Sequence, residues 1–264
     1  MKPASIGGAI AAFAVPVALA ATPPAAVEDV PTPRGVTVRI LVAKPENPWV
    51  TLLVFTGGQG DLWISDKGEI GQMKGNFLIR TNDLFLARGA ATAIIDTPSD
   101  RSNLSHFRDT ETHARDVGAV IRHLRTKFGL PVWVIGTSNG STSAANAGAL
   151  LTAGAERPDG VVLTSSRFLS DRFGTSVIDL AVDRIAVPVL IAHHRNDNCR
   201  GASPDRVPAL LAKLKNAKPA KALLYEGASG ITAGACEGRH YHGFVGIEDK
   251  VVADIMAWIR NPSP

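Results

Sequence analysis

Short apolar runs recur along the chain from residue 36, and stretches with a helical spacing of apolar positions separate them. Apolar residues occupy every second position of residues 36–42, which is typical of a half-buried strand. The other runs are almost continuously apolar, as expected for strands that are buried on both faces of a parallel sheet. These runs cover residues 49–55, 91–95, 131–135, 160–163, 187–192 and 222–225.

The segments between the apolar runs predict helices. In residues 112–128, Val117, Ile121, Leu124 and Phe128 lie on one helical face, and Gly129 ends the helix. The other predicted helices are at residues 76–88, 141–151 and 176–184, within 203–215, and around residues 251–259. Strands that alternate with helices at this spacing predict an α/β fold, with a mostly parallel, doubly wound sheet and helices on both faces.

The length and composition suit one domain. The chain has 264 residues, of which 45% are hydrophobic, so it can bury one substantial core. We assign residues 35–264 to this domain and expect no obligate protein partner. The net charge is +4, and basic and acidic residues are interspersed, so we expect no nucleic-acid partner.

The first 20 residues predict export. Lys2 is followed by apolar or small residues over 6–19, and Ala18-Leu19-Ala20 has the small-x-small form of a signal-peptidase site. The apolar stretch is short for a membrane span, so we predict a cleaved signal peptide at residues 1–20 and no stable membrane insertion afterwards. Residues 21–34 then form a flexible, Pro-rich lead-in. The mature protein is expected to be periplasmic or secreted.

Export affects the interpretation of the two cysteines, Cys199 and Cys236. An even number of cysteines in an oxidising compartment usually pairs, so we predict a disulfide between them, with two buried thiols as the alternative. His194 and His240 lie nearby in the sequence, but the spacing of these four residues is too irregular to indicate a zinc site. We therefore expect no metal.

The pentapeptide Gly136-Thr137-Ser138-Asn139-Gly140 lies between an apolar run and a stretch of small residues. A G-x-S-x-G sequence between a strand and a helix is typical of a nucleophile elbow, with the serine at the tip of a sharp turn. The strained turn needs small flanking residues, because strand and helix pass close together.

Candidate partners for Ser138 follow in the order acid, then histidine. Asp197 comes just after the apolar run 187–192, and His242 precedes the last predicted helix. A serine hydroxyl needs a base to remove its proton, and a histidine base needs a carboxylate to fix its tautomer. His240 is the alternative base, and Asp171 or Asp179 the alternative acid.

With these motifs the chain resembles the α/β-hydrolase superfamily from about Val36 to its end. The resemblance implies a triad of Ser138, Asp197 and His242, and His242 is preferred because a glycine and an aromatic residue follow it. Many members insert a lid domain after the strand that follows the elbow, but the connection here, residues 163–187, is too short. The chain departs from the family at His194, where glycine is frequent, and in the sequence of the oxyanion loop.

An oxyanion hole is also expected, because the tetrahedral intermediate of acyl transfer carries negative charge on oxygen. One backbone N–H should come from Asn139, which follows the nucleophile. The other should come from Gly58 or Gln59 in the glycine-rich loop after the run 49–55. Trp63 and Met73 either line an acyl pocket or belong to a small satellite core.

The predicted function is that of an exported serine hydrolase, which cleaves small-molecule carboxylic esters through an acyl-enzyme. No metal or organic cofactor is needed for this chemistry. A serine peptidase of the same fold is one alternative. A binding protein that kept the fold and lost activity is another.

Overall fold

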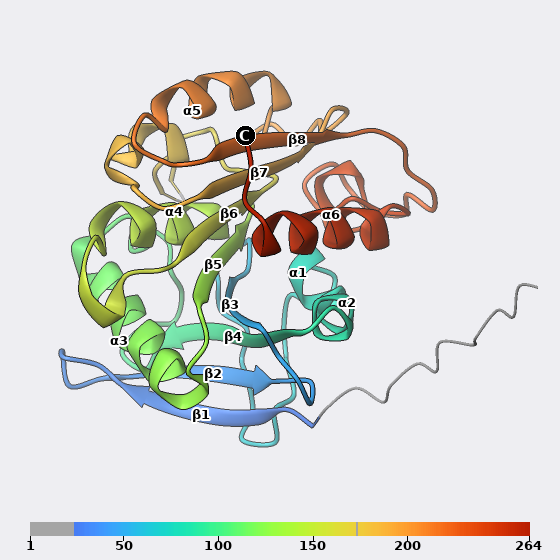
Figure 1. Cartoon of the computed structure of the whole chain (residues 1–264). Helices are drawn as coiled ribbons and strands as arrows, with labels where there is room; N and C mark the ends of the chain where they lie inside the picture. Colours follow the sequence, from blue (N-terminus) through green and yellow to red (C-terminus); the bar gives the residue numbers. More distant parts are fainter. Residues whose placement is uncertain (1–23, 173) are drawn as a thin grey trace, which may run out of the picture.

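The computed structural model describes residues 24–172 and 174–264, so the predicted signal peptide at 1–20 lies outside the described residues. In this part of the chain, eight strands form one sheet in the order β1-β2-β4-β3-β5-β6-β7-β8 (Figure 1). The strands are β1 (Ala26–Pro31), β2 (Thr37–Ala43), β3 (Val50–Phe55), β4 (Ala90–Pro98), β5 (Val132–Thr137), β6 (Gly160–Thr164), β7 (Val189–His194) and β8 (Ala220–Tyr225).

The strands from β3 to β8 run parallel, whereas β2 is antiparallel to both of its neighbours, β1 and β4. The mostly parallel sheet predicted from the apolar runs is therefore confirmed. Parallel strands place their carboxyl ends at one edge of the sheet, so the loops after β3, β5 and β7 meet there. These three loops carry the glycine-rich segment 56–60, Ser138 and Asp197, respectively.

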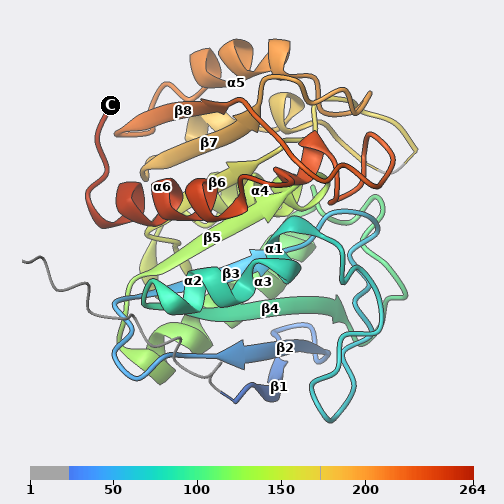
Figure 2. The same cartoon turned by 90° about the vertical axis from the view of Figure 1, so that its right-hand side faces the viewer.

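Helices cover both faces of the sheet (Figures 1 and 2). The helices are α1 (Phe77–Arg80), α2 (Asn82–Ala87), α3 (Glu111–Phe128), α4 (Gly140–Leu150), α5 (Val207–Lys213) and α6 (Glu248–Arg260). Side chains of α3, α4 and α5 pack into one hydrophobic cluster, and those of α1, α2 and α6 pack into the other. None of the helices in the described residues is long and apolar enough to cross a membrane.

The predicted flexible lead-in is wrong for part of its length. Residues 26–31 form β1, which pairs with β2 in a regular antiparallel register, and Val30 is buried against the core. A strand at the sheet edge can tolerate proline, since one of its sides makes no ladder hydrogen bonds. The composition of residues 21–34 therefore did not predict β1, because this strand is stabilised by its pairing with β2.

Two predicted helices are also broken. The helix expected at 76–88 is divided into α1 and α2 at Thr81, whose hydroxyl donates to the carbonyl of Phe77 at 2.6 Å and so competes with the helical backbone. The helix expected at 176–184 consists of two short 3-10 turns, Val177–Asp179 and Val182–Arg184. Side-chain hydrogen bonds and packing, rather than apolar spacing, decide these two segments.

Candidate active site

Ser138 lies at the tip of the turn between β5 and α4, with a φ of 53°. This left-handed backbone is uncommon for a residue other than glycine and is the strained conformation expected of a nucleophile elbow. A Cβ atom at Gly136 would lie 2.2 Å from the Gly140 carbonyl oxygen, and one at Gly140 would lie 2.2 Å from the Phe55 carbonyl oxygen. Both glycines of the motif are therefore required by close backbone contacts.

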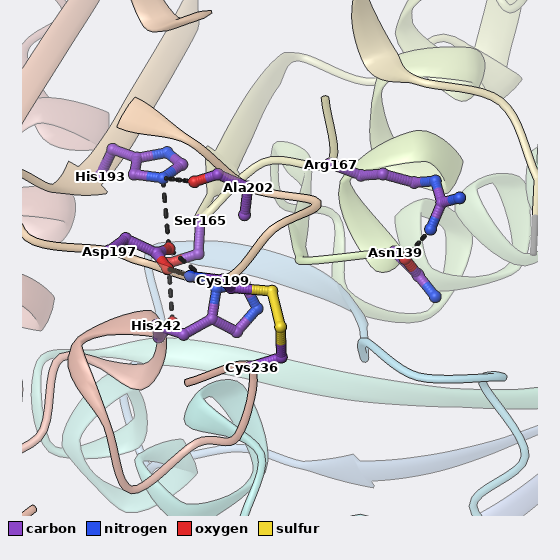
Figure 3. Close-up of a disulfide and its surroundings, with 9 residues drawn as sticks. All are labelled: Asn139, Ser165, Arg167, His193, Asp197, Cys199, Ala202, Cys236 and His242. Atoms are coloured by element: carbon purple, nitrogen blue, oxygen red, sulfur yellow. Dashed lines mark hydrogen bonds and ion pairs between the residues drawn. A yellow bond between two sulfur atoms is a disulfide. The ribbon is translucent and has the colours of Figure 1, made fainter. Parts of the chain in front are cut away.

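Asp197 and His242 meet beside the elbow although they lie on different loops. Asp197 follows β7, and His242 belongs to a 3-10 helix, Tyr241–Gly243, that precedes α6. The Nδ1 atom of His242 lies 2.8 Å from Oδ2 of Asp197, and both side chains are buried (Figure 3). With Nδ1 bound, Nε2 is the ring nitrogen left to exchange a proton. Within the described residues, this Nε2 is buried and has no hydrogen-bond partner.

The carboxylate of Asp197 is held in its charged form. Burial by itself would raise its pKa, but contacts with His193 and His242 outweigh burial and lower the pKa to about 2. The Oδ1 atom also accepts a hydrogen bond from the Cys199 backbone N–H at 3.0 Å. Asp197 is therefore ionised at neutral pH, as a group that orients a histidine and stabilises its cation must be.

A disulfide joins the loop of Asp197 to the loop of His242. Cys199 and Cys236 are bonded as the sequence predicts, with their Cα atoms 4.6 Å apart (Figure 3). Ser165, directly after β6, adds a second link, because its hydroxyl donates to the His242 carbonyl at 2.8 Å. The φ of Ser165 is 42°, so this support is also strained.

Arg80, the last residue of α1, also stabilises the loop that carries His242. Its Nη2 atom donates to the Gly238 carbonyl at 2.9 Å and also to the Gly243 carbonyl. Its Nη1 atom pairs with Glu248 in the first turn of α6. One guanidinium therefore connects both ends of the segment that carries His242 to the final helix.

The glycine-rich loop after β3 packs directly on Ser138. A Cβ atom at Gly57 would lie 3.0 Å from the Ser138 Cβ, and Gly58 has a φ of 58°. Within the described residues, the backbone N–H groups of Gly58, Gln59 and Asn139 make no hydrogen bond to another protein group. These N–H groups are thus available to bind a ligand oxygen.

The side chain of Asn139 connects the elbow to this loop. Its Nδ2 atom donates to the Gly58 carbonyl at 2.9 Å, and its Oδ1 atom accepts from Nη1 of Arg167 (Figure 3). Arg167 is buried and also pairs with Asp171. The two backbone segments expected to form the oxyanion hole are therefore joined by a side chain.

Arg108 is a second buried cation on the same side. It donates to the Thr56 carbonyl at 3.0 Å and to the Ser143 hydroxyl at 2.9 Å. Burial, and then repulsion from Arg167, lowers the pKa of Arg108 to about 9. Nε2 of His113 is hydrogen-bonded to the same Ser143 hydroxyl at 3.0 Å. Burial and the nearby Arg108 lower the pKa of His113 to about 3, so the His113 ring is neutral at pH 7.

A cavity of about 250 Å³ opens beside Ser138. Ser138 and His242 both line this cavity, together with Gly57, Gly58 and Met73. Met73 thus belongs to the cavity wall, while the Trp63 side chain is 65% exposed. Gln59 is an exposed residue outside the lining, so the geometry favours Gly58 over Gln59 as the loop donor.

The alternative site residues have other partners. Asp171 pairs with Arg167, and Asp179 accepts a hydrogen bond from the Ser170 hydroxyl at 2.7 Å. His240 packs edge-on against Tyr241. In the part of the chain that the structure describes, no group of three or more His, Cys, Asp or Glu residues could hold a metal ion.

Sequence reasoning missed several residues that support the site. The contacts that bring these residues to the site join positions 35 to 163 residues apart in the chain. They are Arg80 to Gly243, Arg108 to Ser143, and Ser165 to His242. No local motif marks such contacts. Arg108 lies in the loop after β4 and Ser165 directly follows β6. These positions after strand ends carried the only available signal, since the carboxyl ends of parallel strands meet at one edge.

No protein-family model matches the sequence, and no curated protein matches it. Solved structures do resemble the fold. The Pyrococcus furiosus esterase Pf2001 aligns with a TM-score of 0.65 and 11% identity over 95% of this chain and 96% of that chain. XC6422 from Xanthomonas campestris, described as a member of a/b serine hydrolase without lid, aligns with a TM-score of 0.54 and 15% identity over 91% and 96%.

The dienelactone hydrolase from Anabaena variabilis has a TM-score of 0.61 and 15% identity over 90% of this chain and 98% of that chain. At such low identity these likenesses show the fold alone. This chain has the α/β-hydrolase fold.

Proposed function

We propose that the protein is an exported serine hydrolase that cleaves carboxylic esters through an acyl-enzyme. The single observation that carries the proposal is the cavity that Ser138 and His242 line together, with Nδ1 of His242 bound to a buried Asp197. The proposed nucleophile, acid and base follow one another along the chain in the order that is typical of this fold, which supports the proposal.

In the proposed reaction, Nε2 of His242 removes the Ser138 hydroxyl proton as Oγ attacks the ester carbonyl carbon. The C–O bond to the alcohol then breaks, and His242 returns the proton to the leaving alkoxide. Water attacks the resulting serine ester in the same way and releases the acid. Asp197 keeps Nδ1 protonated and stabilises the imidazolium, because its own pKa of about 2 leaves it charged throughout.

The carbonyl oxygen becomes negative in each tetrahedral intermediate. We propose that the backbone N–H groups of Gly58 and Asn139 bind it, since the first lines the cavity and the second directly follows Ser138. Loss of one such donor typically slows catalysis about 10²–10³-fold. The buried cation of Arg108 behind the loop favours negative charge on the same side.

Esters are proposed as the substrate class because solved structures of this fold that resemble the chain include the Pyrococcus furiosus esterase and a cold-adapted esterase from an Arctic intertidal metagenomic library. The small cavity suits a small molecule. Export is proposed from the sequence of residues 1–20, and the disulfide is compatible with an oxidising compartment.

The test is labelling with a fluorophosphonate, together with turnover of nitrophenyl esters. The protein should label at one serine and hydrolyse the esters, and Ser138→Ala should remove labelling and lower turnover by several orders of magnitude with the fold retained. Ser102→Ala, at an exposed serine, should change neither.

Full labelling of the Ser138→Ala variant would refute the assignment of the nucleophile. Cleavage of peptide anilides in preference to esters would identify a peptidase instead. Failure of the unmodified protein both to label and to hydrolyse any ester would favour a binding protein.

A further inference from the structure

Two adjacent histidines, His193 and His194, end β7 and are both fully buried. Each places Nε2 against a backbone carbonyl, at 2.8 Å from Ala202 for His193 and 2.7 Å from Gly227 for His194. The two rings differ in their other contacts. Nδ1 of His194 accepts a hydrogen bond from the Asn196 N–H, and the His194 ring stacks on Tyr241. The Nε2 atom of His193 also lies 3.3 Å from Oδ2 of Asp197, the oxygen that binds His242 (Figure 3).

The surroundings of Nε2 define the proton on the His193 ring. The Ala202 carbonyl and the Asp197 carboxylate both accept hydrogen bonds, so Nε2 must carry a hydrogen. The ring stacks on Phe168, with centroids 5.7 Å apart and an interplanar angle of 21°, which fixes its direction. His193 is therefore a fixed donor that points at the carboxylate from the side opposite to His242 in Figure 3.

The carboxylate needs a donor of this kind. Its Oδ1 atom is held by the Cys199 N–H, whereas Oδ2 contacts only the two histidines among the described residues. Without His193, the only donor to Oδ2 among the described residues would be His242, which is the side chain that Asp197 has to orient. A donor that is itself fixed by backbone and by stacking removes this circular dependence.

We propose that His193 is a positioning residue for the catalytic acid: it holds Oδ2 of Asp197 in line with Nδ1 of His242. The proposal rests on the proposed function of Ser138, Asp197 and His242. His193 does not line the cavity beside Ser138, so in this proposal it acts only through Asp197. His194 shares its burial, strand and carbonyl partner type, but among the described residues its ring makes no hydrogen bond or ion pair with the carboxylate, so it is the control.

The test uses two polar replacements that differ in reach. The amide nitrogen of glutamine extends about as far from the backbone as Nε2 of histidine, whereas that of asparagine extends only about as far as Nδ1. His193→Gln should keep most of kcat. His193→Asn should lower kcat about 10- to 100-fold with KM nearly unchanged, because a misplaced catalytic group can cost up to about 10²-fold. The pair His194→Gln and His194→Asn should give equal kcat values.

A double-mutant cycle separates positioning from general stability. If His193 acts through Asp197, His193→Asn should cause no further loss of kcat in an Asp197→Ala background. Multiplicative losses, or equal kcat for His193→Gln and His193→Asn in folded protein, would overturn the proposal. If either replacement at 193 fails to fold, His193→Met is measured in the unmodified protein and in the Asp197→Ala variant. A loss of kcat in the unmodified protein alone would support the proposal, and an equal loss in both would overturn it.

The outcomes also separate this proposal from the proposed function. An unmodified protein that neither labels nor hydrolyses esters would overturn both. An active protein that loses activity on Ser138→Ala, but is insensitive to the residue at position 193, would overturn the positioning role alone.

Discussion

The two sides of Ser138, the proposed oxyanion side and the proposed base side, differ in what supports them. On the oxyanion side, Arg108 and the Asn139 side chain donate to backbone carbonyls, those of Thr56 and Gly58. On the base side, Asp197 holds the His242 ring, and the disulfide and Ser165 hold the loop behind it.

The difference follows from what each side must leave free. A backbone N–H that is to bind an oxyanion cannot be used for support, so the oxyanion loop is held through its carbonyl oxygens. A histidine that is to transfer a proton at Nε2 is held through Nδ1 and through its own carbonyl. In both cases every contact is made to the atom that takes no part in the proposed reaction.

The two sides also carry opposite charge. The oxyanion side contains the buried guanidinium groups of Arg108 and Arg167, whereas the base side contains the buried carboxylate of Asp197. In the proposed reaction, negative charge develops on the carbonyl oxygen and positive charge on His242. Each fixed charge is therefore opposite in sign to the charge that develops beside it, which is the arrangement that preorganised electrostatics requires.

The largest expected effect tests the base side. His242→Ala should lower kcat/KM by about 10⁴-fold or more, because the serine loses its base. His240→Ala, two residues away in the same loop, should keep most of the activity, since among the described residues His242, and not His240, is hydrogen-bonded to Asp197. Steady-state ester hydrolysis measures both. If the two effects were exchanged, the base would be His240.

An intermediate effect is expected on the oxyanion side. Asn139→Ala keeps the backbone N–H but removes the link to Gly58, so the loop donor is loosened and not lost. The expected result is a fall in kcat of about 10-fold, below the 10²–10³ typical for loss of a donor, with weaker binding of a boronic-acid transition-state analogue.

Asn146→Ala is the matched control for this change. Asn146 lies in α4, the helix that begins directly after Asn139; it is buried and donates to a backbone carbonyl, that of Thr110, away from the loop. Asn146→Ala should lower the melting temperature about as much as Asn139→Ala does, but should not weaken binding of the boronic-acid analogue. Equal effects of the two variants on that binding would show that the Asn139 side chain does not position the loop.

The smallest effect on activity is expected from the disulfide. Replacing both cysteines by serine should leave kcat within a few-fold, because the Asp197–His242 hydrogen bond and Ser165 still hold the base. Stability should fall, since closing a loop between residues 37 apart contributes about 4 kcal/mol in the chain-entropy model.

Thermal unfolding with and without dithiothreitol measures this loss. The unmodified protein should become less stable under reduction, and the double serine variant should not respond. A loss of kcat as large as that of Asn139→Ala would show instead that the covalent link, and not the hydrogen bonds, positions the base side.

The parallel strands could be predicted from the sequence because their signal is local. Strands buried on both faces appear as apolar runs, and the predicted run at 160–163 differs from β6 by one residue at one end. The elbow could be predicted because turn geometry restricts Gly136 and Gly140, which lie in the motif itself. By contrast, β1 and the break at Thr81 depend on partners elsewhere or on competing hydrogen bonds, which apolar spacing does not record.

The sequence by itself determined the α/β architecture, the elbow and the order of the candidate residues, because each follows from patterns within a few neighbouring positions. Only the tertiary structure decided which side chains support them. The contacts of Arg80, Arg108 and Ser165 join segments far apart in the chain, and His193 reaches Asp197 through the bend after β7. Such contacts depend on how the loops at the sheet edge fold over one another, and no local pattern encodes that arrangement.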